Sequence, residues 1–315
     1  MNEFTLYVGH GSRDADGNEE FLQFIGRVIE QTHAQTQNAG AEACFLELAA
    51  PTIPQGIAAC IARGADRIVI VPVILLAASH VKMEIPEFID AARKQYPHVD
   101  FVYGRNVGLH EKIIDLLLFR FQQEAGELSA PELAETAIVL MGRGSSDPDA
   151  NGDLYKIARQ LWERTGVQTV EVCFTGITFP RLPEGIGRAL ALGAKRLVVV
   201  PYFLFTGVLI KRMQILLSDL QSQHPQIRMT MAEYFGMHQD LAQIVLERRE
   251  EARNGRSFMN CDLCQYRKLA ASDHGHSHSE DHSHDHDHSD GHGHGHGHGH
   301  GHHPRQDEDD ALIKA

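Results

Sequence analysis

The sequence predicts an α/β protein built from two similar domains, each a small parallel sheet flanked by helices. A disordered His-rich tail is expected to follow them. Two observations carry this prediction: the body of the chain repeats itself once, and each repeat alternates short apolar runs with stretches of helical periodicity. Strands separated by helices indicate parallel βαβ units. A period of about 130 residues indicates duplicated domains rather than a solenoid of short repeats.

The repeat is visible as four blocks that return in the same order. Their offsets of 133, 129, 129 and 128 residues are nearly constant. The pairs are GHGSRD (9–14) with GRGSSD (142–147), ACFLELAAP (43–51) with VCFTGITFP (172–180), GADRIVIVPVILLAASHVKM (64–83) with GAKRLVVVPYFLFTGVLIKRM (193–213), and GLH (108–110) with GMH (236–238).

Each element of the first half has its own signal. The run RIVIVPVIL is rich in β-branched residues, which is typical of a strand covered on both faces. Phe21, Ile25, Val28 and Ile29 fall at helical spacing, and Gly64 follows an expected helix as a cap. The expected order is strand 4–10, helix 18–35, strand 41–48, helix 53–63, strand 67–75, helix 84–96, strand 99–104 and helix 110–124, and the second half follows the same order.

The repeat and the change of composition near residue 254 divide the chain into two domains and a tail. We expect an N-terminal domain over residues 1–125, a second domain over 136–253 with a linker at 126–135, and a tail over 254–315. Fourteen His residues fall within His274–His303, interleaved with Gly, Asp and Ser. Such a segment has no apolar side chains to bury, which predicts disorder in the absence of metal.

Charge and hydropathy narrow the class of function. From Ala270 onward ten acidic residues stand against two basic ones, so most of the net charge of −13 belongs to the tail. The remaining body has no basic stripe, which argues against a nucleic-acid partner. No apolar stretch is long enough for a membrane helix, and the start shows no secretion signal. A cytoplasmic protein is therefore expected, with Cys44, Cys60 and Cys173 as core residues.

Three side chains of the first half have the chemistry of a metal site. His10 follows the first expected strand, Glu47 ends the second and His80 follows the third. The carboxyl ends of parallel strands lie at one edge of a sheet, where ligands of such folds bind. Two neutral imidazoles and a carboxylate suit a borderline divalent cation such as Co, Fe, Ni or Zn.

The second half has lost all three of these residues. Arg143, Gly176 and Leu209 stand at the corresponding positions, while the surrounding scaffold residues remain. Taken singly, His10 could be a turn residue that only hydrogen-bonds backbone, and His80 or Glu47 an ordinary solvated side chain. The joint loss favours one working metal site per chain. His110 and His238 survive in both repeats, which indicates a role in the fold near a helix N-terminus.

The segments GHGSRD, FLELAAP, VPVILLAASHVKMEIP and VPYFLFTGVLIKRM resemble the class II chelatase family, in its long CbiX type. The resemblance covers nearly the whole chain, including a MxCxxC motif and a His-rich tail. It implies that the two similar domains face each other across a cleft. It implies that His10 and His80 bind the metal as active-site residues and that Glu47 helps with metal or substrate. It also implies a substrate-contacting loop made of Leu75, Leu76, Ala77, Ala78 and Ser79 together with His80.

The reaction implied by the resemblance is insertion of Co²⁺ into a sirohydrochlorin-type tetrapyrrole, in cobalamin (vitamin B12) and porphyrin-type biosynthesis. The ring loses two pyrrole protons, and His10 is the expected acceptor because a His titrates near neutral pH. Candidates for holding the ring's carboxylates are Arg13, Lys82, Arg143 and Lys211. Iron insertion for sirohaem and a non-catalytic nickel or cobalt chaperone stay open as alternatives.

The C-terminal segment carries two further metal signals. Cys261 and Cys264 of MNCDLC have the C-x-x-C spacing of metal or cluster ligation, and the resemblance implies an iron–sulfur cluster there. Two thiolates are fewer than the usual four ligands, so a second chain of a homodimer or tail His residues would complete the set; a redox dithiol is the alternative. The tail itself is expected to bind divalent metal ions for storage or delivery.

Overall fold

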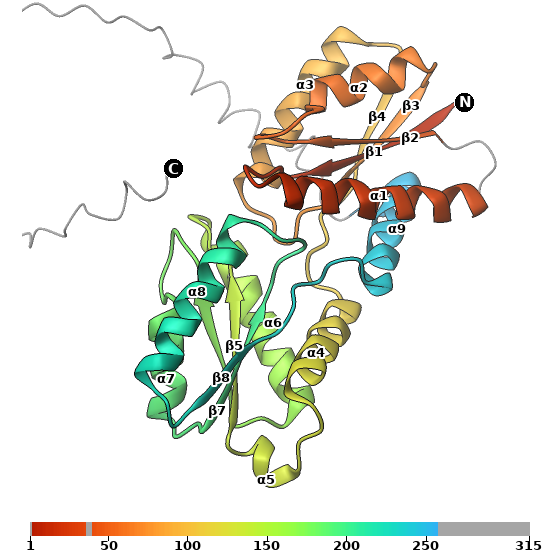
Figure 1. Cartoon of the computed structure of the whole chain (residues 1–315). Helices are drawn as coiled ribbons and strands as arrows, with labels where there is room; N and C mark the ends of the chain where they lie inside the picture. Colours follow the sequence, from red (N-terminus) through yellow and green to blue (C-terminus); the bar gives the residue numbers. More distant parts are fainter. Residues whose placement is uncertain (1, 36–39, 258–315) are drawn as a thin grey trace, which may run out of the picture. The chain divides into compact units, whose positions relative to one another are not determined.

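The computed structural model describes residues 2–35 and 40–257. Its described strands form two parallel four-stranded sheets, in the orders β2-β1-β3-β4 and β6-β5-β7-β8 (Figure 1). Helices flank both sheets, as the sequence predicted. No helix among the described residues has the length and apolar character needed to cross a bilayer.

The two halves present the same elements in the same order. The first half contains β1 (Glu3–Gly9), α1 (Ala15–Gln35), β2 (Gly40–Phe45), α2 (Ile53–Ala62), β3 (Arg67–Pro72), the π-helical turn η1 (His80–Glu84), α3 (Ile85–Gln95), β4 (Asp100–Tyr103) and α4 (Glu111–Ala125). The second half contains β5 (Thr136–Gly142), α6 (Pro148–Thr165), β6 (Thr169–Phe174), α7 (Leu182–Ala191), β7 (Arg196–Pro201), α8 (Val208–Gln223), β8 (Arg228–Met231) and α9 (Gln239–Arg253).

Three local features differ from the expected elements. The second strand ends at Phe45 rather than at Leu48, so Glu47 lies in the loop after it. The expected linker at 126–135 contains a short helix, α5 (Ala130–Leu133), which a capping box between Ser129 and Glu132 begins. The third strand ends at Pro72 rather than at Leu75. Val73 still donates its N–H to the Val8 carbonyl at 2.8 Å, but the chain then leaves the sheet to form the loop that leads to η1.

The register of the two sheets matches residue for residue. Val8 pairs with Cys44 and Pro72, and its counterpart Met141 pairs with Cys173 and Pro201. All neighbouring strands are parallel, so the carboxyl ends of β1, β2 and β3 lie at one edge of the first sheet. The loops that follow these strands are thereby brought together, which positions the candidate site.

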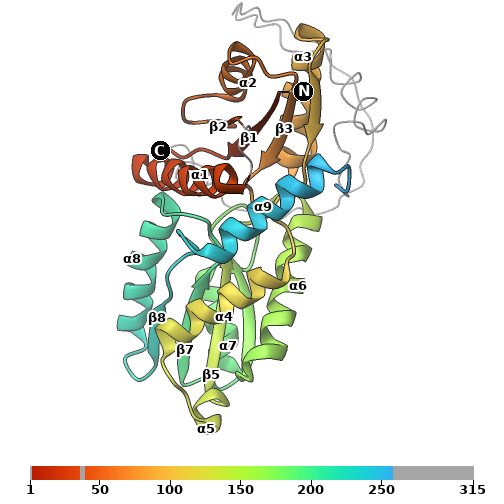
Figure 2. The same ribbon diagram turned by 90° about the vertical axis from the view of Figure 1, so that its right-hand side faces the viewer.

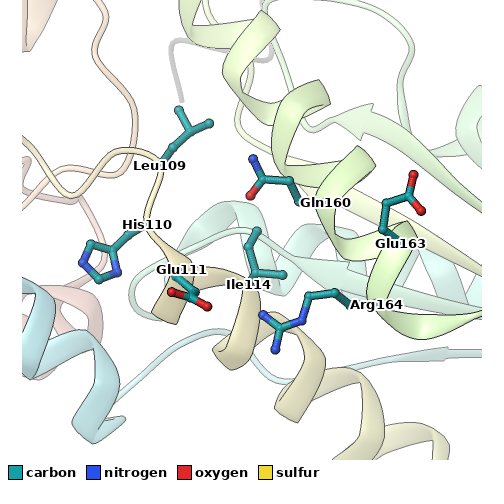
Figure 3. A pocket seen from close by; sticks show the side chains of 7 residues that line it. All are labelled: Leu109, His110, Glu111, Ile114, Gln160, Glu163 and Arg164. Carbon is teal, nitrogen blue, oxygen red and sulfur yellow. The ribbon is translucent and has the colours of Figure 1, made fainter.

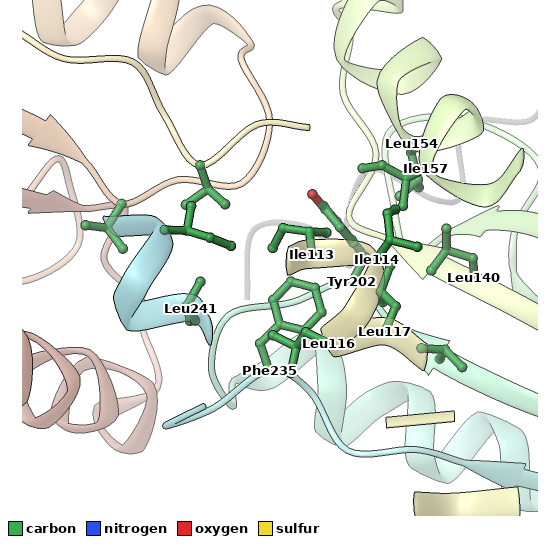
Figure 4. Packing of buried hydrophobic residues seen from close by; sticks show 14 of the residues in the cluster. Ile113, Ile114, Leu116, Leu117, Leu140, Leu154, Ile157, Tyr202, Phe235 and Leu241 are labelled. Atoms are coloured by element: carbon green, nitrogen blue, oxygen red, sulfur yellow. The ribbon is translucent and has the colours of Figure 1, made fainter. Parts of the chain in front are cut away.

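The closing helix of each half packs against the sheet of the other half. Helix α4 contacts β7 and α6, whereas α9 contacts β3, β4 and α1 (Figures 1 and 2). Ile113, Ile114 and Leu117 of α4 are buried with Leu140 of β5 and with Tyr202, which directly follows β7 (Figure 4). One continuous core therefore spans both halves.

Two buried arginines of α9 hold this helix against the first half. Arg248 is 3% exposed and donates to the carbonyls of Asn106 and Val107 at 3.1 and 2.9 Å. Arg249 donates to the Thr5 hydroxyl at 2.8 Å. The two halves fall within one compact unit. The boundaries at residues 125 and 136 mark the repeat in the sequence, and a division into independently folding domains there stays a prediction.

Candidate metal centre

Three side chains from three consecutive strand–helix connections meet at the carboxyl edge of the first sheet. His10 comes directly after β1, Glu47 comes two residues after the end of β2, and His80 begins η1. Their ligand atoms all lie within 4.8 Å of one another. Nε2 of His10 is 3.6 Å from Oε1 of Glu47, and the rings of His10 and His80 meet edge to face with centroids 4.7 Å apart. One divalent ion can be shared by all three.

His10 is held in the form that binds metal. Its Nδ1 lies 2.9 Å from the Gly11 carbonyl oxygen and donates to it, which leaves Nε2 unprotonated with a lone pair to share. Burial lowers the pKa of His10, and the charge of Arg143 lowers it further. The ring is therefore neutral at neutral pH, which is the state required of both a metal ligand and a proton acceptor.

The backbone beside His10 favours glycine at position 11. Gly11 has a φ of +91°, and a Cβ added there would lie 1.8 Å from the backbone oxygen of Glu47. The Glu47 N–H in turn donates to the His10 carbonyl at 3.0 Å. The loops that carry the first two ligands are thus locked together through their backbones.

His80 is oriented by a carboxylate one turn away. Glu84 lies 2.8 Å from Nδ1 of His80, which then donates and leaves Nε2 for an ion. The pair spans η1, and π-helical turns are frequent at functional sites. The sequence reasoning missed Glu84, although a carboxylate four residues after a His on a helix was readable as a facing pair.

The π-helical turn coincides with a length difference between the halves. Arg67 pairs with Asp100 across the first sheet, and Arg196 pairs with Arg228 across the second. The first half therefore has one residue more between its third and fourth strands. A turn closed by i→i+5 hydrogen bonds takes up one additional residue, and the second half has an ordinary helix, α8, in this place.

The second half offers a different set of side chains at the equivalent edge. Among the described residues, His10, Glu47 and His80 form the one group of three or more metal-ligating side chains. Arg143 stands in place of His10, and its Nη1 lies 2.8 Å from Nε2 of His10 itself. The guanidinium of the second half thus lies where a metal ion bound to Nε2 of His10 would be placed.

Two of the four expected cations are already paired. Lys82 contacts Asp147 at 2.7 Å and Asp149 at 3.0 Å. Its counterpart Lys211 contacts Asp14 and Asp16 at 2.7 and 2.8 Å. These ion pairs join each half to the first helix of the other, so the structure gives both lysines a role between the halves rather than free positive charge.

The other residues predicted from sequence fall in defined places. His110 and His238 cap α4 and α9 by accepting hydrogen bonds from the N–H groups of Lys112 and Asp240, which confirms their expected place at helix N-termini. The loop from Leu75 to Ser79 lies between β3 and η1, and the Leu75 carbonyl accepts from the Gly108 N–H and the Asn106 side chain, both at 2.8 Å. Cys261, Cys264 and the His-rich tail lie outside the described residues.

A cavity of about 510 Å³ lies elsewhere, between the start of α4 and α6 (Figure 3). Leu109, His110, Glu111 and Arg164 are among its lining residues. None of the three convergent ligands borders it, and His110 there is engaged as a helix cap and with Glu247. The chemistry of the ligand set places the candidate site at His10, Glu47 and His80 instead.

The fold and the site together define a class: a duplicated α/β protein with three candidate metal ligands at the carboxyl edge of its first sheet. Within that class the chain belongs to the CbiX family, whose model matches residues 5–124 and 137–252.

Named relatives agree with this family. The chain is 48% identical to a sirohydrochlorin cobaltochelatase of Priestia megaterium over 86% of each chain. It is 39% identical to a sirohydrochlorin ferrochelatase of the same organism, over 76% of this chain and 87% of the relative. The solved structure of SirB from Bacillus subtilis with Fe³⁺ is 34% identical, covers 81% of this chain and 97% of its own, and aligns with a TM-score of 0.70. A SirB structure from subspecies spizizenii in complex with cobalt, 33% identical with the same coverage, aligns with a TM-score of 0.67.

Proposed function

We propose that the chain is a sirohydrochlorin cobaltochelatase, a lyase that inserts Co²⁺ into sirohydrochlorin during cobalamin biosynthesis. The observation that carries the proposal is the convergence of two neutral imidazoles and a carboxylate within 4.8 Å at the mouth of one sheet. The family and the relatives supply the substrate class, since both named relatives act on sirohydrochlorin.

In the proposed mechanism the metal is a substrate that Nε2 of His10, Nε2 of His80 and Glu47 present to the ring. The tetrapyrrole loses two N–H protons as the metal enters, so the site needs unprotonated groups beside the ion. Once the ion has moved from these side chains onto the ring nitrogens, Nε2 of His10 and the carboxylate of Glu47 are free and would take one proton each. His10 is neutral and able to accept a proton because burial and Arg143 hold its pKa below the ordinary value. Arg143 leaves Nε2 of His10 when the ion binds, and its guanidinium is then free to hold a carboxylate of the ring.

The test is a visible-spectrum assay of sirohydrochlorin with Co²⁺, comparing the wild type with the double variant His10→Ala/His80→Ala. Loss of two ligands is expected to lower the insertion rate at least about a hundredfold. His98→Ala, at an exposed site before β4, is the matched control and should keep the wild-type rate. Insertion by the double variant at the wild-type rate would show that these residues are not the site.

Cobalt is preferred over iron on the identity of the relatives, because the cobaltochelatase is the more similar of the two. The ligand types themselves accept both metals. Parallel assays with Co²⁺ and Fe²⁺ at equal free concentration decide between them. A higher kcat/KM for Fe²⁺ would replace this proposal with sirohaem synthesis.

The proposal also covers the C-terminal segment. Cys261 and Cys264 would hold an iron–sulfur cluster, completed by tail His residues or by a second chain in a homodimer, and the tail would store or deliver divalent metal in the cytoplasm. An absorption band near 400 nm in anaerobically purified protein supports the cluster. Insertion of many metal ions by each protein molecule would distinguish an enzyme from a metal chaperone. If the tail delivers metal, deletion of residues 274–315 should leave the insertion rate unchanged at saturating Co²⁺ and lower it at limiting Co²⁺.

A further inference from the structure

Two tight turns lie at equivalent positions in the two halves, each beginning two residues after the end of the half's second strand. In the first half the Ala49 N–H donates to the Glu47 carbonyl at 2.8 Å, around Leu48 at a φ of 64°. In the second half the Thr178 N–H donates to the Gly176 carbonyl at 2.7 Å, around Ile177 at a φ of 67°. A three-residue turn with positive φ at its centre is the rare, strained form of the γ-turn.

The central residues make these turns more unfavourable still. Leu48 and Ile177 are the non-glycine residues with positive φ among those described, and a β-branched residue in that region is an outlier. Their side chains are also 51% and 54% exposed. Glycine would relieve the backbone strain and remove the exposed apolar surface at once. Strained residues that persist in this way cluster at ligand sites.

Both turns border the candidate metal centre. Leu48 follows Glu47 directly, and Glu47 is bonded through its backbone to His10. On the other half, the Gly176 N–H donates to the Arg143 carbonyl at 3.1 Å, and the Arg143 side chain reaches His10. The two turns are therefore joined by hydrogen bonds to the loops that carry the ligand set, one turn from each half.

The second turn carries an additional apolar surface. Phe179 is 66% exposed, and the Arg181 guanidinium lies 4.8 Å from its ring centroid. Glu47 is replaced by Gly176 on this side, so the second half presents apolar side chains and arginines where the first presents metal ligands. A flat, apolar ring with carboxylates at its rim matches that combination.

We propose that Leu48 and Ile177 are substrate-binding residues that contact the apolar face of the tetrapyrrole, one from each half, and hold it over the three metal ligands. The inference rests on the proposed function, because it assumes that the substrate is a macrocycle. It gives the half without ligands a part in substrate binding.

The test measures sirohydrochlorin binding without metal, by absorbance or fluorescence titration of the full chain. Leu48→Gly and Ile177→Gly are each expected to raise the Kd about tenfold, as removal of a contacting aliphatic side chain does. Glycine relieves the strained φ, so the Tm should stay level or rise by about 2 °C. Co²⁺ affinity should stay within twofold of the wild type, because no metal ligand changes.

Leu192→Gly provides the matched control. Leu192 is 56% exposed at the end of α7, with an ordinary φ of −79°. It precedes β7 and lies at the opposite edge of the sheet from the site. Its replacement should lower the Tm and leave the Kd unchanged, the reverse of the result at the two turns.

The variants Leu48→Asn and Ile177→Asn separate side-chain chemistry from backbone shape, because Asn tolerates positive φ yet is polar. They should also bind sirohydrochlorin more weakly. If the double glycine variant binds sirohydrochlorin and turns it over like the wild type, the inference is wrong while the proposed function stands. If the wild type itself fails to bind sirohydrochlorin, both are wrong.

Discussion

The two halves of this chain share one backbone arrangement and differ in the side chains at the carboxyl edge of each sheet. Each has a GxGS loop whose second glycine packs against a carbonyl after the second strand, Glu47 in one half and Gly176 in the other. Each has the same γ-turn and the same strand register. Only the first half carries His10, Glu47 and His80. The comparison teaches that the loop geometry is set by the fold, whereas the metal ligands are a separate layer that can be lost without disturbing it.

The halves also depend on one another. Each closing helix covers the other half's sheet, and Lys82 and Lys211 form matching ion pairs across the halves. The second half places Arg143 on His10. The half without ligands therefore contributes to the electrostatics of the site that it does not itself contain.

The largest expected effect tests the shared loop design. Gly11→Ala and Gly144→Ala each place a Cβ against a backbone oxygen, at 1.8 and 2.3 Å, in a region of positive φ. Both should destabilise the fold by about 3 kcal/mol or more, measured by chemical denaturation. Gly26→Ala, in the middle of α1 with open space around its Cβ position, should be neutral or stabilising. A tolerated Gly144→Ala would break the equivalence of the two loops.

The next effect tests whether the π-helical turn η1, found only in the first half among the described residues, orients His80 through Glu84. Glu84→Gln keeps the size of the side chain but weakens its hold on Nδ1 of His80. Co²⁺ affinity should fall about tenfold, measured by titration in the absence of tetrapyrrole. Glu87→Gln, on the exposed side of α3, is the control. Equal affinity in both variants would mean that η1 does not orient the ligand.

A smaller effect concerns the arginine that the second half sends to His10. Burial is the first cause of the lowered pKa of His10, and Arg143 the second, so Arg143→Ala should raise that pKa only partway toward 6.5. Activity that needs the neutral ring is lost as the pH falls through the pKa of His10. The acid limb of the kcat/KM profile should therefore move to higher pH in the variant.

The same substitution also frees Nε2 of His10 for metal. Co²⁺ should bind about two- to fivefold more tightly to Arg143→Ala at neutral pH, the range expected for loss of one partly exposed charge contact. Arg27→Ala, at an exposed position in α1, controls for a general change of charge. An unchanged pH profile together with unchanged Co²⁺ affinity would contradict the contact between the halves.

The smallest effect compares the two interhalf ion pairs. Lys82→Met and Lys211→Met should each lower the Tm by about 1–2 °C, because partly exposed ion pairs contribute little and salt screens them. The loss should be larger for Lys82, which is 31% exposed against 49% for Lys211. High salt should erase the difference between variants and wild type. A Tm drop that persists in high salt would point to lost packing instead.

Much of the fold and part of the site followed from the sequence alone. The repeat, the alternation of strands and helices and the parallel order depend on local periodicity and on motifs that recur along the chain, so they are readable residue by residue. The same logic placed His10, Glu47 and His80 at one edge, because parallel strands end together.

Only the tertiary structure decided which distant groups meet. Three contacts join segments up to about 200 residues apart. Helices α4 and α9 each pack against the sheet of the other half, Lys82 and Lys211 pair with carboxylates of the opposite half, and Arg143 approaches His10. The strained turns at Leu48 and Ile177 depend on φ angles that no apolar residue prefers. Neither contacts across halves nor disfavoured backbone angles leave a local pattern, since both are imposed by the packing of the complete fold.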